Sequence, residues 1–414
     1  MSHLAIRGAT PVRSEPFPAW PEITERDVEA VAEVVRNGQI GGWPEPGPKA
    51  GEFAERFAAY QGAEHGIVMS NGTVTMEVAL KALGIGWGDE VIVPALTFAA
   101  TAYAAVAAGA LPVVVDIEPE RWTIDPAAVE AAITPRTRAV MPVHLGQQMC
   151  DMDALTAIAD RHDLAIVEDC AHAHGQRWND RGAGSIGAFG SFSHQSSKVL
   201  TGGEGGTLLT NDPALARRAH SIIDCGRPKD ADEREYTFGC NYRLGELNCA
   251  LLCTQLDRYE EQRAEREGGA RLFEELAAGL PGVRLNRIDP RITRWGFYRY
   301  LFAIDPDEFA GAGNEAVVTA LEAEGIPAEL QYPPMSRYDL FQPKLSRLPV
   351  CVEHAEALDP SRWSFPVAED AGECRAVYLN ENVFRAGREG VEHVVEAIAK
   401  VQRHADELRA LTAA

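Results

Sequence analysis

The sequence predicts an α/β protein with a large domain, in which helices flank a mostly parallel central sheet, and a smaller C-terminal α+β domain. Between about residues 64 and 210, short apolar runs alternate with amphipathic helical patterns, and crossovers of that kind join parallel strands. The predicted strands are nearly continuous apolar runs, as expected where helices cover both faces of a sheet. At 414 residues the chain is also long for one hydrophobic core.

The elements of the large domain follow in order along the chain. Strands are expected at 65–70, 90–93, 111–116, 139–143, 164–168, 188–193 and 206–210. Helices are expected at 74–83, 99–108, 126–132 and 152–161, and again from Pro213.

After Asn241 the pattern changes, and residues 244–277 predict one long, charged helix. The remaining elements are strands at 283–285 and 297–304, a helix near 314–324 and a last helix from Val391. No linker-like composition separates these parts. We therefore expect domains at residues 12–250 and 251–414, with the long helix at their junction.

The charge of the chain excludes some classes of partner. It has 39 basic and 61 acidic residues, a formal net charge of −22. A surface of that sign repels nucleic-acid phosphates and anionic lipid headgroups, so we expect neither as a partner. No apolar run approaches the ~18 residues of a membrane span, and the N-terminus lacks the layout of a secretory signal. A cytoplasmic protein is the expectation.

The eight cysteines include no C-x-x-C pair, and the chain has no H-x-x-x-H. Neither a metal site nor a disulfide framework is predicted. Cys249 and Cys253 lie four positions apart in an apolar helical stretch, where we expect buried free thiols.

Lys198 is the first candidate for catalysis. The chain has six lysines, and no other lies between Lys81 and Lys229. Lys198 follows a predicted strand and precedes a glycine-rich turn, whereas an exposed lysine usually lies on a charged helix face. A lysine in a dry, confined site loses part of its preference for the charged form and can form a Schiff base. The alternative is a loop lysine with no special role.

Asp169 ends an apolar strand, at the sheet edge where open α/β folds bind ligands. If a pyridine cofactor is present, an aspartate here can keep the ring nitrogen protonated. The alternative is a helix N-cap for the segment that follows.

Two further features lie at predicted strand ends. Residues 70–73 (SNGT) lie between a strand and a helix, where backbone N–H groups and the helix dipole attract phosphate; ordinary helix capping is the alternative. Phe98 follows another strand, and an aromatic ring there can stack on a flat heterocycle or pack in the core. The chain has no P-loop motif.

These residues and their order closely resemble the DegT/DnrJ/EryC1/StrS aminotransferase family, which depends on pyridoxal 5′-phosphate and adopts the fold-type I architecture. The resemblance extends from about Val12 to the C-terminal helix. It rests on ordered motifs, which are WPEITERDVEAVAEVVRNGQI, MSNGTVTMEVALKALGIGWGDEVIVPALTFAATA, PVHLGQQMCDMDAL, EDCAHAHG, SFSHQSSKVLTGGEGG and GCNYRLGELNCALLCTQL.

The resemblance implies roles for particular residues. Lys198 would form the Schiff base with the cofactor and then move the proton between the cofactor and substrate carbons, while Asp169 would pair with the pyridinium nitrogen. Lysine rather than histidine at position 198 separates the chain from relatives that act as dehydratases. The other implied cofactor contacts are Phe98 and His172 beside the ring, and Gly72, Thr73, Ser193 and Asn241 at the phosphate.

Asn241 would reach the phosphate from the partner subunit, which implies a homodimer with shared active sites. Gln195 and Arg243 also occupy family positions.

The segments EDCAHAHGQRW, DCGRPKD and SSKVLTGGEGG resemble the branch of aminocyclitol aminotransferases and 3-amino-5-hydroxybenzoate synthases. That branch implies transfer of an amino group from L-glutamine or L-glutamate to a keto-cyclitol such as a keto-inositol. His194, Ser196 and the stretch YLNENVFRAG depart from the branch pattern, which implies a changed acceptor pocket. Few lysines and many arginines are typical of a GC-rich source such as an actinomycete, which suits aminoglycoside or other antibiotic biosynthesis.

Three alternatives stay open at this point. The acceptor can be a nucleotide-linked keto sugar, or the lysine can drive a 3-amino-5-hydroxybenzoate-type synthase. The acidic substrate of such a synthase needs a cationic partner, for which Arg227 and Arg337 are candidates. The chain can also be a catalytically silent ligand-binding member of the fold, against which Lys198, Asp169 and Asn241 argue.

Overall fold

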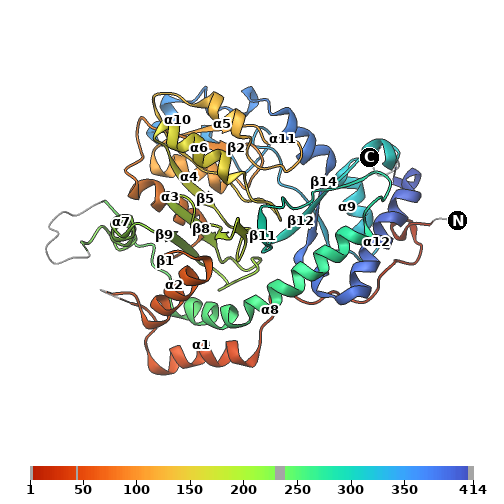
Figure 1. Cartoon of the computed structure of the whole chain (residues 1–414), viewed down its shortest axis with the longest axis horizontal. Coiled ribbons are helices and arrows are strands. Elements are labelled where there is room, and N and C mark those ends of the chain that lie inside the picture. The colour runs from red at the N-terminus through yellow and green to blue at the C-terminus, as the bar shows by residue number, and fades with distance from the viewer. Residues whose placement is uncertain (1–2, 43–44, 229–237, 409–414) are drawn as a thin grey trace.

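The structure is a computed structural model that describes residues 3–42, 45–228 and 238–408. It contains a seven-stranded sheet and a four-stranded sheet. Helix α8 (Glu246–Leu276) runs from beside α2 (Pro48–Gln61) to α12 (Gly387–Arg403), along both halves of the molecule (Figure 1). The long helix predicted from the charge pattern is confirmed, and the domain boundary at residue 250 stays a prediction.

The large sheet confirms the mostly parallel α/β prediction. Its strand order is β1-β9-β8-β5-β4-β2-β3, and β9 alone runs antiparallel to its neighbours β1 and β8. The strands are β1 (His65–Met69), β2 (Glu90–Pro94), β3 (Leu111–Val115), β4 (Thr137–Val140), β5 (Ala165–Asp169), β8 (Phe189–Ser193) and β9 (Gly206–Thr210).

Helices cover both faces of this sheet, which explains the apolar strands. Along β2, Val91 and Val93 pack with the helices of one face, whereas Ile92 belongs to the core on the opposite face. The first face is covered by α3 (Gly72–Ala82), α4 (Ala100–Ala108) and α7 (Pro213–Ile223). The second is covered by α2, α5 (Pro126–Ala132), α6 (Met152–His162) and α8.

Local sequence sets where these helices begin. A side-chain oxygen accepts from a backbone N–H of the first turn in α3, α5, α6 and α7, and proline occupies the first turn of α5 and α7. The capping residues are Asn71, Asp125, Asp151 and Asp212.

The small sheet has the antiparallel order β10-β12-β14-β13, with α9 (Asn314–Ala323) and α12 beside it. Its strands are β10 (Val283–Leu285), β12 (Arg299–Ile304), β13 (Ala328–Leu330) and β14 (Ala376–Asn380). The sequence predicts β10, β12 and both helices, but not β13 and β14. The three residues of β13 (AEL) include none with a β-branched or aromatic side chain, and β14 directly follows a helical turn, with no loop residue between them.

The remaining elements are short or peripheral. Helix α1 (Glu25–Asn37) packs on α8, on the outside of the molecule (Figure 1). The others are β6 (Arg177–Trp178), β7 (Arg181–Gly182), β11 (Ile292–Arg294), α10 (Pro349–Glu353) and α11 (Pro366–Asp370). Within the described residues, no helix combines the length and the apolar character needed to cross a membrane.

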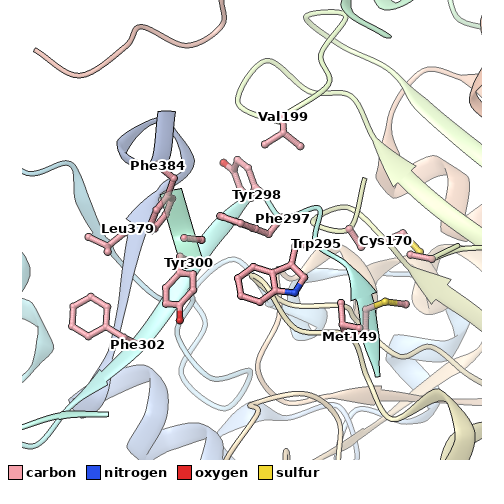
Figure 2. Close-up of a cluster of buried hydrophobic side chains, with 14 of the residues drawn as sticks. Met149, Cys170, Val199, Trp295, Phe297, Tyr298, Tyr300, Phe302, Leu379 and Phe384 are labelled. Carbon is pink, nitrogen blue, oxygen red and sulfur yellow. The ribbon is translucent and has the colours of Figure 1, made fainter. Parts of the chain in front are cut away.

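An aromatic cluster joins the two sheets into one core. Figure 2 shows Phe297, Tyr298 and Tyr300 in one cluster that also includes Phe384 and Val199. Phe297 and Tyr300 are at most 1% exposed, and Tyr298 is 6% exposed. Because interiors pack at crystal-like density, this cluster fixes the start of β12 against the Lys198 loop.

Candidate active site

A pocket of about 850 Å³ lies between the carboxyl edge of the large sheet and the small sheet. Residues from both parts of the molecule line this pocket. The small sheet therefore covers the edge of the large sheet, where open α/β folds bind ligands. Every predicted site residue except Asn241 lines this pocket; these are Gly72, Thr73, Phe98, Asp169, His172, Ser193 and Lys198. Residues spread over 126 positions of sequence, from 72 to 198, are thus brought together.

Asp169 ends β5 and is 5% exposed. Its Oδ2 accepts from Thr101 Oγ1 at 2.9 Å, and its Oδ1 accepts from the N–H of Ala171 at 3.2 Å. No helix follows residue 169, so the helix N-cap alternative is wrong, and the bond to Ala171 closes a local turn. Burial raises the pKa of Asp169, opposed by these two bonds and by Lys198. A buried carboxylate of this kind is stabilised by a cationic partner.

A second part of the pocket is the N-terminus of α3. Asn71 caps this helix by accepting from the N–H of Val74 at 3.0 Å, while Gly72 and Thr73 line the pocket beside Ser193. A Cβ at position 72 would lie 2.7 Å from Ser193 Cβ, so only glycine permits this close approach. Unsatisfied N–H groups of a first helical turn and a nearby hydroxyl form a site for a phosphate.

Lys198 lies on the loop that follows β8. Hydrogen bonds hold both its backbone N–H and its backbone carbonyl. Its N–H donates to Gln195 O at 2.8 Å, and Trp20 Nε1 donates to Lys198 O at 3.2 Å. The amine Nζ lies 4.2 Å from the centroid of the Tyr298 ring. Burial lowers the pKa of Lys198 to about 7, with Arg299 acting in the same direction and Asp169 opposing it. Near neutral pH, much of this amine is therefore unprotonated and nucleophilic.

This lowered pKa predicts a pH dependence for the apoprotein. The neutral fraction of the Lys198 amine should rise as the pH rises through about 7, whereas the amine of an ordinary lysine becomes neutral only near pH 10.4. Competitive labelling with trace acetic anhydride, followed by peptide mass analysis, measures this fraction at each lysine. Exposed Lys344 is the internal reference. If the labelling of Lys198 rose with pH only in parallel with that of Lys344, the lowered pKa of Lys198 would be wrong.

His172 and Phe98 complete the pocket walls near Lys198. The His172 ring lies 4.7 Å from the Tyr298 ring, its Nδ1 accepts from the N–H of Gly146 at 3.2 Å, and its Nε2 lies 3.4 Å from Tyr332 Oη. Burial lowers the pKa of His172 well below its usual value. The ring is therefore neutral, and its proton is on Nε2 because Nδ1 is an acceptor.

Phe98 is 45% exposed, and its ring centroid lies 5.8 Å from that of Tyr332. A core role for Phe98 is therefore wrong. The ring is open to the pocket and available to stack on a planar ligand.

Four of the other sequence candidates lie elsewhere. Asn241 is exposed and forms a β-bridge with Asp224, and Arg243 pairs with the same aspartate. Arg227 also pairs with Asp224, and Arg337 pairs with Glu373 at 3.1 Å with 60% of its side chain exposed. Neither Arg227 nor Arg337 lines the pocket of its own chain, so the role of either in binding a substrate carboxylate stays a prediction.

The residues that the small-sheet side contributes were not predicted from the sequence; they are Tyr298, Arg299, Glu329 and Tyr332. The strand predicted at 297–304 included the first two, but its aromatic character indicated core packing. The available signal was Arg299 itself, a charged residue inside an otherwise apolar strand.

The fold and the convergence of Lys198, Asp169 and the α3 N-terminus define an aminotransferase of the fold-type I class. The chain belongs to the DegT/DnrJ/EryC1/StrS aminotransferase family, whose family model matches residues 21–378.

Relatives named as aminotransferases match over nearly the full chain. A protein of Streptoalloteichus tenebrarius, provisionally named L-glutamine:3-amino-2,3-dideoxy-scyllo-inosose aminotransferase, is 42% identical over 99% of this chain and 100% of its own. The L-glutamine:2-deoxy-scyllo-inosose aminotransferase of Micromonospora echinospora is 39% identical over 99% and 100%. The crystal structure of 3-amino-5-hydroxybenzoic acid synthase superposes with a TM-score of 0.82 at 33% identity, covering 94% of this chain and 99% of that one.

Proposed function

We propose that this chain transfers the amino group of L-glutamine to a keto-cyclitol of the scyllo-inosose type, with pyridoxal 5′-phosphate as cofactor. The observation that carries the proposal is the single pocket that joins a nucleophilic lysine, a buried carboxylate and a phosphate cradle. Full-length relatives named for this reaction support the choice of substrates.

The residues of the pocket fit the cofactor. Lys198 would hold its aldehyde, Asp169 its ring nitrogen, and the first turn of α3 with Ser193 its phosphate, while Phe98 and His172 lie beside the ring. When bound, the cofactor supplies the electron sink that stabilises a carbanion next to nitrogen. Lys198 supplies the base that removes and returns the proton at the reacting carbon, and neutral Nε2–H of His172 supplies a hydrogen-bond donor.

Two further parts of the proposal concern the assembly and its location. We propose a homodimer in which Asn241, exposed and outside the pocket of its own chain, contributes to the site of the other subunit. We also propose that the enzyme acts in the cytoplasm, in the biosynthesis of an aminoglycoside or another secondary metabolite.

The charges of the pocket favour an acceptor without phosphate groups over a nucleotide-linked sugar. Among the described lining residues, Lys198 and Arg299 are the basic ones, and Arg299 is already paired with Glu329 at 2.5 Å. A diphosphate would need cationic or backbone donors of its own. A cyclitol needs donors and acceptors for hydroxyl groups, which Tyr332, Glu329 and Gln195 provide.

The acceptor is tested by loading the enzyme with the amino group from L-glutamine and then adding ketones separately. We expect 2-deoxy-scyllo-inosose or its 3-amino derivative to be aminated, with kcat/KM at least about 100-fold above that of a nucleotide-linked keto sugar, because unpaired phosphate charge costs several kcal/mol to bury. Product mass identifies the amine. Preference for the nucleotide sugar would overturn the proposal.

The likeness to 3-amino-5-hydroxybenzoic acid synthase makes a second candidate function, in which the same lysine promotes dehydration of a cyclic keto acid. The presence of Arg299 in the pocket favours this candidate, since it offers a partner for an acid group. An aromatic, ultraviolet-absorbing product from an amino-cyclohexenone acid would identify it.

A further inference from the structure

Arg299 is a buried cation inside the pocket. It begins β12, and 15% of its side chain is exposed. Its guanidinium carbon lies 4.8 Å from the centroid of the Tyr298 ring, the same ring that Lys198 Nζ contacts at 4.2 Å. Because the Lys198 amine and the Arg299 guanidinium lie beside one ring, a small molecule whose amine reaches Lys198 can place a neighbouring acid group at Arg299.

Arg299 is only partly satisfied by the protein. It forms an ion pair with Glu329, which also lines the pocket and is 41% exposed. Its buried Nε has no hydrogen-bond partner among the residues that the structure describes. A guanidinium binds carboxylates best through two parallel N–H donors. The Arg299 guanidinium can therefore still bind a second carboxylate.

We propose that Arg299 binds the α-carboxylate of the amino donor, and that Glu329 is an internal carboxylate that the donor displaces. This inference rests on the proposed function, because it concerns two substrates that use one pocket in turn. The donor carries a carboxylate, whereas a keto-cyclitol has no acid group. A buried cation left without a partner is strongly destabilising, so Glu329 must pair with Arg299 whenever the keto-cyclitol is bound.

The two members of the pair therefore have opposite effects on the donor. Arg299 attracts its carboxylate, and Glu329 competes with it for the same guanidinium. Glu329 lies on β13, which pairs with β14, which in turn pairs with β12. Its side chain is 41% exposed, so it can turn toward solvent when the donor carboxylate takes its place, without moving the sheet.

The test measures the donor half-reaction of the holoenzyme without any ketone, as keto acid released in a single turnover. We expect Arg299→Gln to raise the half-saturating concentration of L-glutamine about 10- to 100-fold, the contribution of a charged hydrogen-bonded contact. In steady state, the KM of the keto-cyclitol should change less than about threefold, because a substrate without an acid group forms no ion pair with Arg299. Glu329→Gln should lower the half-saturating concentration of L-glutamine and tests the same contact without removing the buried cation.

A neutral donor gives an independent readout. The wild type should prefer L-glutamine to its α-carboxamide, and Arg299→Gln should lose that preference, whereas a merely structural effect would weaken both donors equally. Arg375→Gln is the matched control, since Arg375 pairs with Asp370 at 2.7 Å outside the pocket; it should leave both donors unchanged.

Equal loss of both donors in Arg299→Gln, or a higher half-saturating L-glutamine concentration in Glu329→Gln, would overturn this inference. These outcomes are separable from failure of the proposed function. An enzyme that shows the donor effects but aminates no keto-cyclitol refutes the acceptor and retains the carboxylate site.

Discussion

Lys198→Ala should lower turnover by roughly 10⁴-fold or more, the scale of removing a residue that acts as both nucleophile and proton carrier. Among the residues that the structure describes, Lys198 is the one lysine that lines the pocket, so no other described amine is placed to replace it. The variant should still fold, because an alanine removes a buried amine whose charge burial disfavours. Multiple-turnover assays with L-glutamine and a keto-cyclitol, together with circular dichroism, measure both effects.

A covalent readout separates chemistry from binding in this variant. Borohydride reduction in the presence of pyridoxal phosphate should attach the cofactor to position 198 of the wild type and of Lys344→Ala, but not to Lys198→Ala. Lys344 is exposed and does not line the pocket, so its variant should also keep full turnover. Wild-type rates in Lys198→Ala, or reduction onto a different lysine, would refute the role of Lys198.

The large-domain half of this site could be predicted from sequence because parallel strands impose a rule. Asp169, Ser193 and the turn before α3 each lie at a strand end, and the ends of β5, β8 and β1 meet at one region of the sheet edge. Spacing and apolar runs identify such strand ends without knowledge of tertiary packing.

The small-sheet half could not be predicted in this way. Tyr298, Arg299 and Glu329 come from an antiparallel sheet whose placement depends on the aromatic cluster around Phe297 and Tyr300 and on helix α8. Such packing is set by shape complementarity between distant segments, and periodicity carries no information about it. The role of Asn241 is also beyond what one chain can test, because a residue proposed to act in another subunit is not expected in the pocket of its own chain.

Asp169→Asn is expected to lower turnover by about 10²- to 10³-fold, the effect of removing one preorganised electrostatic contact at a reacting centre. The amide preserves the shape of the side chain and can still accept from Thr101, as the carboxylate does at 2.9 Å. It lacks the negative charge that would hold a proton on a ring nitrogen, so the electron sink is weakened while the pocket stays intact. The loss should therefore appear in kcat more than in KM for L-glutamine.

The stability of the same variant should change in the opposite direction from its activity. Burial raises the pKa of Asp169, so the unfolded chain releases this proton at a lower pH than the folded chain, and the ionised carboxylate opposes folding as the pH rises above about 4. Asp169→Asn removes this penalty, and at pH 7 its apoprotein should unfold at the same denaturant concentration as the wild type or a higher one. Asp125→Asn, which exchanges one good N-cap of α5 for another, should change neither stability nor turnover. Wild-type kcat in Asp169→Asn would show that the reaction does not need the carboxylate. Loss of activity only through unfolding would show that the carboxylate serves the fold, whereas a catalytic carboxylate is kept at the expense of stability.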